Sequence, residues 1–254
     1  GALLVGPEMG RLASGRIGVG RLSNKETIIG AIRLAIGQAE DLSGKKIVVS
    51  AGGTQEPIDP VRYVGNYSSG KMGYALAEAA RDRGASVSLV TTSPMSDPYG
   101  MRVIHVKQAE EMKVAVSEEC KEADAVVMAA AVADYRPTNV AQQKIKKEKQ
   151  GNLVIEMEKT CDILADMDNT NGLIKVGFAA ESQDLISNAK EKVRAKGLHL
   201  IAANNVMDPD AGFNSDTNRI MLLDREGEVE ELPLLSKYDA AQRILDRVVT
   251  LIVN

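Results

Sequence analysis

The sequence predicts a doubly wound α/β fold, with a mostly parallel, Rossmann-like sheet and an antiparallel hairpin towards the C-terminus. Two observations predict it. Short apolar segments rich in Val and Ile alternate with amphipathic helical segments from residue 45 onward, and the segments 218–223 and 228–232 are joined by the turn sequence DREG. Alternation of this kind is typical of a parallel sheet whose crossover helices cover both faces, and two strands joined by a tight turn form a hairpin.

The individual elements are assigned from hydrophobic periodicity, since continuous apolar runs indicate buried strands and apolar residues on one helical face indicate helices. The expected strands are 46–51, 85–91, 102–107, 124–132, 153–158, 174–180, 198–203, 218–223 and 228–232. The expected helices are 25–39, 71–83, 108–122, a short one near 162–168, 182–196 and 236–250. Gly84 is expected to end the 71–83 helix, because glycine commonly follows a helix C-terminus.

The length of 254 residues allows one large domain, or one domain and a fragment. Residues 1–44 do not follow the strand–helix alternation, because they hold a Gly- and Arg-rich stretch, a single helix and a polar break. We therefore divide the chain into a unit at 1–44 and an α/β domain at 45–254.

Composition excludes several classes of protein. A net charge of −4 with only 3% aromatic residues argues against a nucleic-acid partner. No apolar run reaches the roughly 20 residues that a membrane helix needs, and no secretory signal segment is recognisable, so we expect a cytoplasmic protein. Two cysteines and two histidines are too few for a disulfide framework or a multi-histidine metal site.

Ligands of doubly wound sheets bind outside the carboxyl ends of the strands, so the residues that follow each strand are the candidates for function. Gly52 and Gly53 follow the first strand, and Ser68, Ser69 and Gly70 precede the 71–83 helix. Exposed amides and hydroxyls at a helix N-terminus suit a phosphate. The alternatives are that the glycines only form a tight turn and that Ser69 is only a helix N-cap.

The segment 65–72 nearly matches the phosphate-binding pattern G-x-x-x-x-G-K-[ST], but Met72 stands where that pattern has a hydroxyl residue. It also follows a proline-containing loop rather than a strand. We therefore reject a standard P-loop. No G-x-G-x-x-G follows the first strand, which weighs against a nicotinamide cofactor.

Later strand ends carry further candidates. Small residues and Asp134 end the 124–132 run, where a flat ligand and its hydroxyl or amine groups could bind. Phe178 ends another strand and could stack on a base, and Asn204 could recognise a polar substrate group. Lys144 lies in a basic cluster, where a lysine can stabilise the charge of a transferring phosphoryl group. Core packing, turn formation and a solvated surface remain the structural alternatives at these positions.

Several motifs together identify a family. The segments VSAGGTQEPIDPVRYVGNYSSGKMG, AAVADYRPTNVAQQKIKK, VGFAAES and IAANNV resemble, in this order, phosphopantothenoylcysteine synthetase, the synthetase half of the bifunctional coenzyme A biosynthesis proteins. The resemblance covers about 45–254. It implies a ligase that joins 4'-phosphopantothenate to cysteine, uses CTP with Mg²⁺, passes through an acyl-cytidylate intermediate and forms a homodimer.

The resemblance also assigns roles to residues. Arg62, Asn66 and Lys144 match residues that handle the acyl intermediate or the charge of its activation. The positions that match nucleotide contacts are Met128, Ala129, Ala130, Asp134, Lys159, Thr160, Cys161, Asp162, Phe178, Lys192 and Lys196. The family pattern commonly reads K-N-P-D at 159–162, so Thr160 and Cys161 depart from it. Metal ligands are not identified.

The first unit resembles the C-terminal end of phosphopantothenoylcysteine decarboxylase, through the pattern G-P-x-x-G-x-x-A-C-G at residues 6–15. Ser14 occupies the position of the proton-donating cysteine, and serine is a far weaker acid than a thiol. We therefore expect natural fusion to a decarboxylase flavoprotein domain, but neither FMN nor decarboxylation in this chain. The competing hypotheses are a nicotinamide-dependent reductase on the same fold and a non-catalytic nucleotide-binding module.

Overall fold

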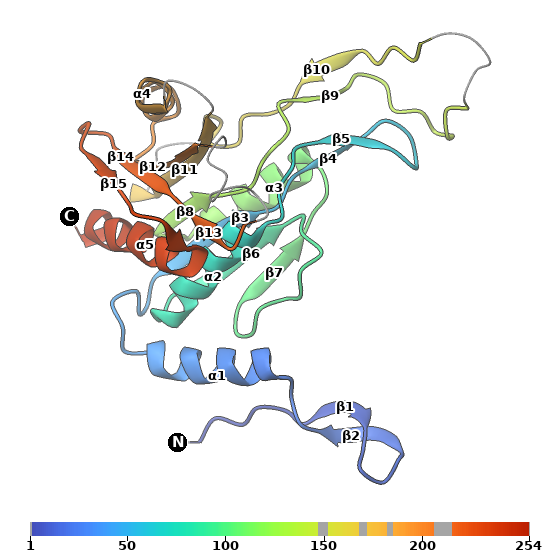
Figure 1. The fold of residues 1–254 in the computed structure, drawn as a ribbon, viewed down its shortest axis with the longest axis vertical. Coiled ribbons are helices and arrows are strands. Elements are labelled where there is room, and N and C mark those ends of the chain that lie inside the picture. Colours follow the sequence, from blue (N-terminus) through green and yellow to red (C-terminus); the bar gives the residue numbers. More distant parts are fainter. Residues whose placement is uncertain (1, 147–151, 168–171, 182–184, 206–214, 254) are drawn as a thin grey trace.

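A computed structural model describes residues 2–146, 152–167, 172–181, 185–205 and 215–253. Its main feature is an eight-stranded sheet in the order β15-β14-β12-β11-β8-β3-β6-β7 (Figure 1). The strands are β3 (Lys46–Ala51), β6 (Ser86–Thr91), β7 (Arg102–His105), β8 (Ala125–Met128), β11 (Ile174–Glu181), β12 (Leu200–Asn205), β14 (Ile220–Asp224) and β15 (Val229–Glu231). Neighbours from β7 to β12 pair in parallel, whereas β14 and β15 add antiparallel.

The parallel part has the strand order of a dinucleotide-binding fold. Numbered along the chain, β7-β6-β3-β8-β11-β12 reads 3-2-1-4-5-6, and the order reverses between β3 and β8. The predicted fold class is thereby confirmed, including the antiparallel hairpin, which is β14–β15. The point of reversal opens a crevice at the carboxyl ends of the strands, where such folds bind ligands.

Helices cover both faces of this sheet. The helices are α1 (Lys25–Gly37), α2 (Lys71–Asp82), α3 (Ala109–Cys120), α4 (Leu185–Lys196) and α5 (Lys237–Val253). Ile47 and Val49 of β3 pack in a core that includes residues of α2 and α5, while Val48 packs in a second core that includes residues of α3 and α4. Because successive strand side chains point to opposite faces, a strand buried on both sides must be continuously apolar, as this one is.

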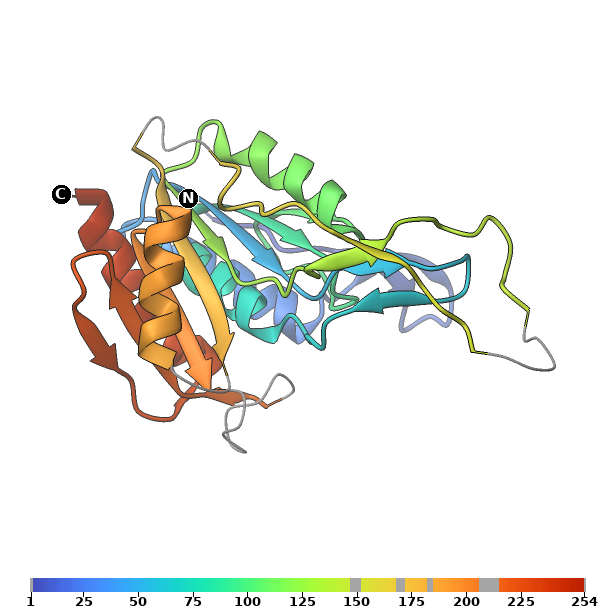
Figure 2. The same ribbon diagram turned by 90° about the horizontal axis from the view of Figure 1, so that it is seen from above.

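Two short hairpins project from the carboxyl edge of the sheet in the same direction (Figure 2). One pairs β4 (Gln55–Pro57) with β5 (Tyr63–Gly65), and the other pairs β9 (Tyr135–Pro137) with β10 (Met157–Lys159). We call the described parts of 55–65 and 135–159 the arm. The Ala141 amide donates to the Ile58 carbonyl at 3.0 Å, which joins the two halves of the arm.

Two sequence predictions need correction. The expected strand at 153–158 is only the three-residue β10, and it pairs with β9 in the arm instead of joining the main sheet. The expected helix near 162–168 is a turn over the described residues, and 168–171 lie outside them. The Ala165 amide bonds to the Asp162 side chain and the Asp166 amide bonds to the Asp162 carbonyl, so the described residues form one capped turn and no longer helix.

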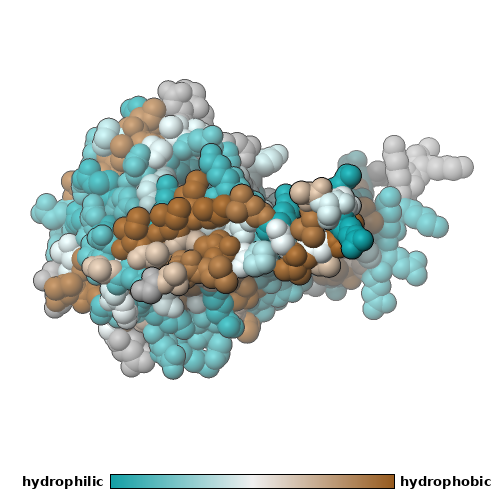
Figure 3. Space-filling model, turned by 90° about the horizontal axis from the view of Figure 1, so that it is seen from below, coloured by the Kyte–Doolittle hydropathy of each residue, from teal (hydrophilic) through white to brown (hydrophobic). Residues whose placement is uncertain are grey.

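The first unit is a hairpin followed by a helix. Strands β1 (Glu8–Arg11) and β2 (Ile17–Arg21) pair antiparallel, a feature that the sequence analysis missed, and α1 packs beside α2. A strip of exposed apolar side chains runs along this unit (Figure 3). It comprises Leu3, Leu4, Met9, Ile17, Val19, Leu22, Ile29, Ile32 and Ile36.

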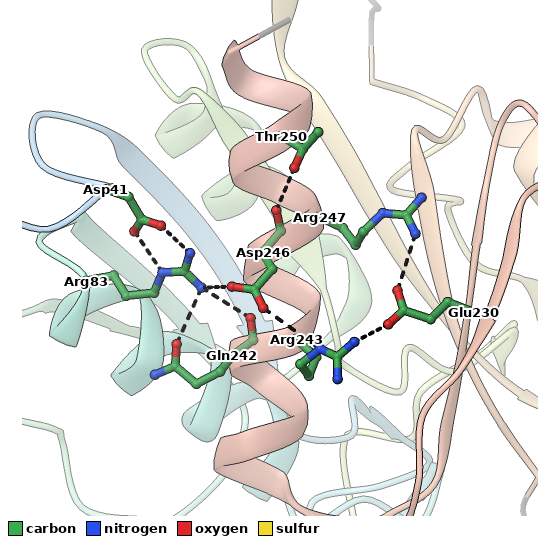
Figure 4. A network of polar contacts seen from close by, with 8 residues as sticks. All are labelled: Asp41, Arg83, Glu230, Gln242, Arg243, Asp246, Arg247 and Thr250. Carbon is green, nitrogen blue, oxygen red and sulfur yellow. Dashed lines mark hydrogen bonds and ion pairs between the residues drawn. The ribbon is translucent and has the colours of Figure 1, made fainter.

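An ion-pair network fixes the C-terminal helix to the rest of the domain (Figure 4). Arg83, which follows α2, bonds to Asp41 and to Asp246 of α5, the latter at 2.8 Å. Arg247 of α5 bonds to Asp224 of β14 at 2.6 Å. Helix α5 therefore packs on one face of the sheet, and Asp41, near the end of the first unit, is joined to it through Arg83.

The remaining pair, β13 (Thr217–Asn218) with β16 (Leu235–Ser236), borders the hairpin β14–β15. None of the helices within the described ranges is both long and apolar enough to cross a bilayer.

Candidate functional site

A cavity of about 940 Å³ lies at the carboxyl edge of the sheet, beside the crossover between β3 and β8. Sixteen of the predicted site residues line it, out of the twenty that the sequence analysis named. These sixteen are Asn66, Ser68, Ser69, Gly70, Met128, Ala129, Ala130, Asp134, Lys159, Thr160, Cys161, Asp162, Phe178, Lys192, Lys196 and Asn204. Residues from six separate parts of the chain therefore meet around one volume.

The floor of the cavity includes the N-terminus of α2. Gly70 is the N-cap residue, in place of the Ser69 cap that we considered, and its φ of 80° is in the left-handed region. A Cβ at Gly70 would lie 2.8 Å from the Cβ of Ser93, so a side chain is excluded there. The Ser68 hydroxyl accepts a weak hydrogen bond of 3.4 Å from the Gly70 amide, and the Ser69 hydroxyl accepts one of 3.4 Å from the Lys71 amide. Helix N-terminal amides of this kind favour an anion.

Gly52 and Gly53 lie outside the cavity lining. A Cβ at Gly53 would approach the Asn66 carbonyl oxygen to 2.5 Å, and one at Gly52 would approach the Thr92 hydroxyl to 2.2 Å. These glycines allow neighbouring segments to pass closely, which is a structural role different from the tight turn considered above. Their effect on the site is indirect, because the close approach at Gly53 places Asn66.

The strand end after β8 forms one wall. The Ala130 amide bonds to the Ser50 hydroxyl at 3.1 Å, and the Ala133 amide bonds to the Thr54 hydroxyl at 2.9 Å. The Asn66 side-chain amide donates to the Val132 carbonyl at 3.0 Å. Buried hydroxyls of the first strand region thus hold the irregular segment 129–134 in one conformation, and small side chains leave room beside it.

A second wall comes from the segment that follows β10. The Thr160 amide donates to the Asp134 carbonyl at 3.0 Å and its hydroxyl donates to the Ala133 carbonyl, so 159–162 is fastened to the strand end. Burial raises the pKa of the Cys161 thiol, which keeps it protonated and unreactive. The departure from K-N-P-D therefore retains a backbone anchor at Thr160, and Cys161 brings no nucleophile.

The lining is rich in ammonium groups. Among its described residues the lysines are Lys71, Lys159, Lys192, Lys196 and Lys237, and the carboxylates are Asp134 and Asp162. Desolvation by burial, followed by the charge of Lys71, lowers the pKa of Lys237. An excess of cations around a concave volume favours a polyanionic ligand, and closely spaced lysines are stabilised when an anion binds between them.

The lining also holds residues that the sequence analysis did not name, among them the polar or flexible side chains of Lys71, Met72, Asn218 and Lys237. Lys71 and Met72 adjoin Gly70 and could have been found from it, because they form the first turn of α2. No sequence signal marks Asn218 or Lys237, which β13 and α5 bring to the cavity. The Oδ1 atom of Asn218 is buried and accepts no hydrogen bond from the described residues.

Arg62 and Lys144 do not line the cavity. Both lie in the arm, where Arg62 bonds to Asp59 and to the Ile145 carbonyl, and Lys144 is exposed. Within one chain the structure therefore brings Asn66 to the cavity, whereas Arg62 and Lys144 lie in the arm, outside the cavity lining.

No group of three or more His, Cys, Asp or Glu side chains that could hold a metal occurs among the described residues. Mg²⁺ is commonly bound through substrate phosphates, water and one or two carboxylates, so a protein cage is not required. Asp134 and Asp162 are the carboxylates of the lining that fit such a role.

Comparison with known proteins agrees with this geometry. The family described as "DNA/pantothenate metabolism flavoprotein C-terminal domain" matches residues 42–252. A relative named "Cysteine/Cysteine sulfinic acid decarboxylase", from an unknown prokaryotic organism, is 40% identical over 98% of this chain and 71% of its own length. The "Coenzyme A biosynthesis bifunctional protein CoaBC" of Mycobacterium bovis is 42% identical over all of this chain, which spans 65% of the length of that relative.

A solved structure has a similar fold. The crystal structure of the C-terminal domain of a coenzyme A biosynthesis bifunctional protein CoaBC is 37% identical, with a TM-score of 0.72, and the match covers 85% of this chain and 99% of that one. The family match, the sequence identity and the shared architecture point the same way: the chain belongs to the family of DNA/pantothenate metabolism flavoprotein C-terminal domains.

Proposed function

We propose that the chain is the phosphopantothenate–cysteine ligase of coenzyme A biosynthesis and that it uses CTP. The observation that carries the proposal is the strand-end cavity, where the small-residue segment 128–134, Phe178 and five lysines line one volume. Family membership and the CoaBC name of the relatives support the same function.

The reaction has two steps. A carboxylate oxygen of 4'-phosphopantothenate attacks the α-phosphorus of CTP, and the bond to the β-phosphate oxygen breaks, releasing pyrophosphate. The amine of cysteine then attacks the acyl carbon, CMP leaves with the bonding electron pair, and the amine loses a proton. Both steps develop negative charge on phosphate oxygens, which nearby ammonium groups stabilise.

Different residues of the lining would contact different parts of CTP. Met128, Ala129 and Ala130 give a flat strand end for the base, Phe178 offers a ring to stack on it, and Asp134 accepts from ribose hydroxyls or the base amine. Lys159, Thr160, Cys161 and Asp162, with Lys192 and Lys196 of α4, bound the other side. Mg²⁺ supplies charge neutralisation of the triphosphate when it is bound, with Asp134 and Asp162 as the carboxylates that could reach its water shell.

The anion site at α2 suits the phosphate or carboxylate of 4'-phosphopantothenate. Ser68, Ser69 and Gly70 present amides and hydroxyls there, and Asn204 lies at the end of β12 in the same lining. Asn66 is placed between this site and the strand end by its bond to Val132. That position suits a residue that orients the acyl phosphate between its two reactions.

The arm suits a homodimer. It exposes the apolar side chains of Val61, Tyr63 and Val140, and it carries Arg62 and Lys144 outside the cavity lining. A second copy packed on the arm would bury these apolar groups and bring functional residues towards a cavity. Sedimentation equilibrium tests this: a concentration-independent monomer mass would rule it out.

The first unit suits attachment to a further domain. Its apolar strip is exposed in this chain (Figure 3), and the relatives are longer than the chain. We infer that 1–44 belongs structurally to a decarboxylase flavoprotein domain, that 45–254 is the ligase, and that the ligase works in the cytoplasm. A variant that begins at residue 40 should keep the full ligase rate. Loss of ligation in a folded truncated chain would contradict this division.

The function is tested by incubating the protein with 4'-phosphopantothenate, cysteine, Mg²⁺ and CTP and measuring pyrophosphate and CMP. Equal formation of CMP, pyrophosphate and amide product is expected, and ATP in place of CTP tests nucleotide choice. Omission of cysteine should stop CMP release while pyrophosphate forms at most once per site. Absence of turnover with both nucleotides would refute the ligase function.

A further inference from the structure

Asp59 connects the two functional residues of the arm. It lies in the loop between β4 and β5, and its carboxylate is fully buried although the loop projects from the domain. Its Oδ1 atom accepts the amides of Val61 and Arg62 at 2.8 and 2.9 Å. Such bonds to amides two and three positions ahead are the ordinary stabilisation of a turn by Asp.

The hydrogen bonds of the second carboxylate oxygen, Oδ2, go beyond those that stabilise a turn. Oδ2 accepts the Arg62 guanidinium through Nε at 3.0 Å and through Nη2, and it also accepts the Ile145 amide at 3.1 Å, from the other half of the arm. The same guanidinium donates to the Ile145 carbonyl at 3.0 Å. Asp59 and Arg62 thus hold both polar groups of the residue that directly follows Lys144.

Burial of the Asp59 carboxylate would destabilise the fold if its oxygens lacked these hydrogen bonds. A buried carboxylate is tolerated only when hydrogen bonds or an opposite charge replace water. The Arg62 hydrogen bond, opposed by desolvation and helped by the amides of Val61, Ile145 and Arg62, holds the pKa of Asp59 well below its usual range. The carboxylate is therefore ionised throughout the neutral range and keeps its hold on the Lys144 segment.

We propose that Asp59 is the positioning residue of the ligase, which fixes Arg62 and the backbone next to Lys144 in one geometry relative to each other. The catalytic part of this inference rests on the proposed ligase function. Asp59 touches neither the cavity lining nor, by its burial, a substrate. It acts through Arg62 and through the Lys144 segment, which it reaches by its bond to the Ile145 amide, 86 residues away in sequence.

The first test is Asp59→Asn, which keeps the shape but removes the charge and turns one acceptor into a donor. We expect kcat to fall about 100-fold, the scale of a small misplacement of catalytic groups, while the KM for CTP stays within about twofold because the cavity is untouched. Amide hydrogen exchange at Ile145 should accelerate in the same variant, which can be measured without any turnover. Asp246→Asn is the matched control, because Asp246 also pairs with a half-buried arginine but far along the chain from the arm.

The second test uses the Lys144 variant. If Asp59 acts through Lys144, the double variant Asp59→Asn with Lys144→Gln should be no slower than Lys144→Gln alone, since residues that act as a unit are non-additive. Multiplicative losses in the double variant would overturn the coupling. If Asp59→Asn does not fold, Ile145→Pro removes the amide that Asp59 accepts, and Ile145→Ala, which also lacks the Ile side chain but retains the amide, is its control.

The outcomes separate the two proposals. Unchanged exchange at Ile145 in a folded Asp59→Asn protein would overturn the anchoring. Faster exchange with an unchanged kcat would overturn the positioning role. If the wild-type chain has no ligase turnover, the proposed function fails, and the exchange experiment still decides whether Asp59 anchors the Lys144 segment.

Discussion

The ammonium group of Lys196 lies 2.8 Å from the carboxylate of Asp162, and both residues line the cavity. The pair joins the last turn of α4 to the segment that follows β10. The lysine is therefore held in the lining by a neighbouring carboxylate.

Replacing Lys196 should weaken nucleotide binding without unfolding the protein. We expect Lys196→Gln to raise the KM for CTP about tenfold, equivalent to about 1.4 kcal/mol. Stability should change little, because partly exposed ion pairs contribute little to it. Lys190→Gln, an exposed lysine of the same helix that is absent from the lining, is the control. Equal effects of both substitutions on KM would show that Lys196 contributes only general charge.

Substitutions should separate the contribution of Phe178 to core packing from its contribution to base stacking. It is half-buried, packs against the core and lines the cavity. Phe178→Leu keeps most of the apolar volume but removes the ring, so the loss of stacking, worth roughly 1–3 kcal/mol per base, should appear in the KM for CTP. Phe178→Tyr retains the ring and should bind CTP normally. A similar KM for the Leu variant and wild type would assign Phe178 to the core alone.

Lys175 should stabilise the segment that bounds the cavity. It is 1% exposed, and its ammonium donates to the carbonyls of Leu164 and Met167 at 3.2 and 2.9 Å. Lys175→Met should reduce the free energy of unfolding by about 1–3 kcal/mol, because buried carbonyls lose their donor, and it should raise the KM for CTP. Lys113→Met, which removes an exposed pair with Asp166 of the same segment, is the control. Equal stability losses in a urea titration would contradict the prediction.

His199 should make stability depend on pH just below neutrality. Its Nδ1 atom accepts the Lys175 amide at 3.0 Å, and burial, followed by the charges of Arg225 and Lys175, lowers its pKa from 6.5. The unfolded chain then binds the proton first as pH falls, so the free energy of unfolding should decrease from about pH 6.5 downward. The stabilisation is complete above that pH.

The comparison is His199→Gln, whose urea unfolding should vary less between pH 7 and 5. His105→Gln, which retains His199, should keep the wild-type slope. Identical slopes in all three proteins would show that His199 is protonated equally well in the folded and unfolded states.

The sheet was predictable because its strands are buried on both faces. Segments such as 46–51 are continuously apolar, and the alternation with helices leaves few alternatives to a parallel sheet. The strand order, which depends on contacts distant in sequence, had to come from the structure. The hairpins β1–β2, β4–β5 and β9–β10 were missed or misplaced because strands of three to five residues without a buried face carry no periodic signal.

The candidate site was predictable where its residues follow strands, as at 128–134 and Phe178. Asn218 and Lys237 were missed because the cavity acquires them from β13 and α5, at the far end of the sequence. Gly52 and Gly53, which the sequence analysis assigned to phosphate, lie outside the lining and have close neighbours from other segments. From sequence alone, a glycine that approaches a ligand and one that approaches another strand are indistinguishable.

Helix α2 lies between the cavity and helix α1 of the first unit. Its first turn borders the cavity, and its last turn touches α1, where a Cβ on Gly37 would approach the Asp82 carbonyl oxygen to 2.3 Å. Twelve residues at about 1.5 Å each make this separation about 18 Å. A body seated on the apolar strip and a nucleotide in the cavity would therefore not compete for space.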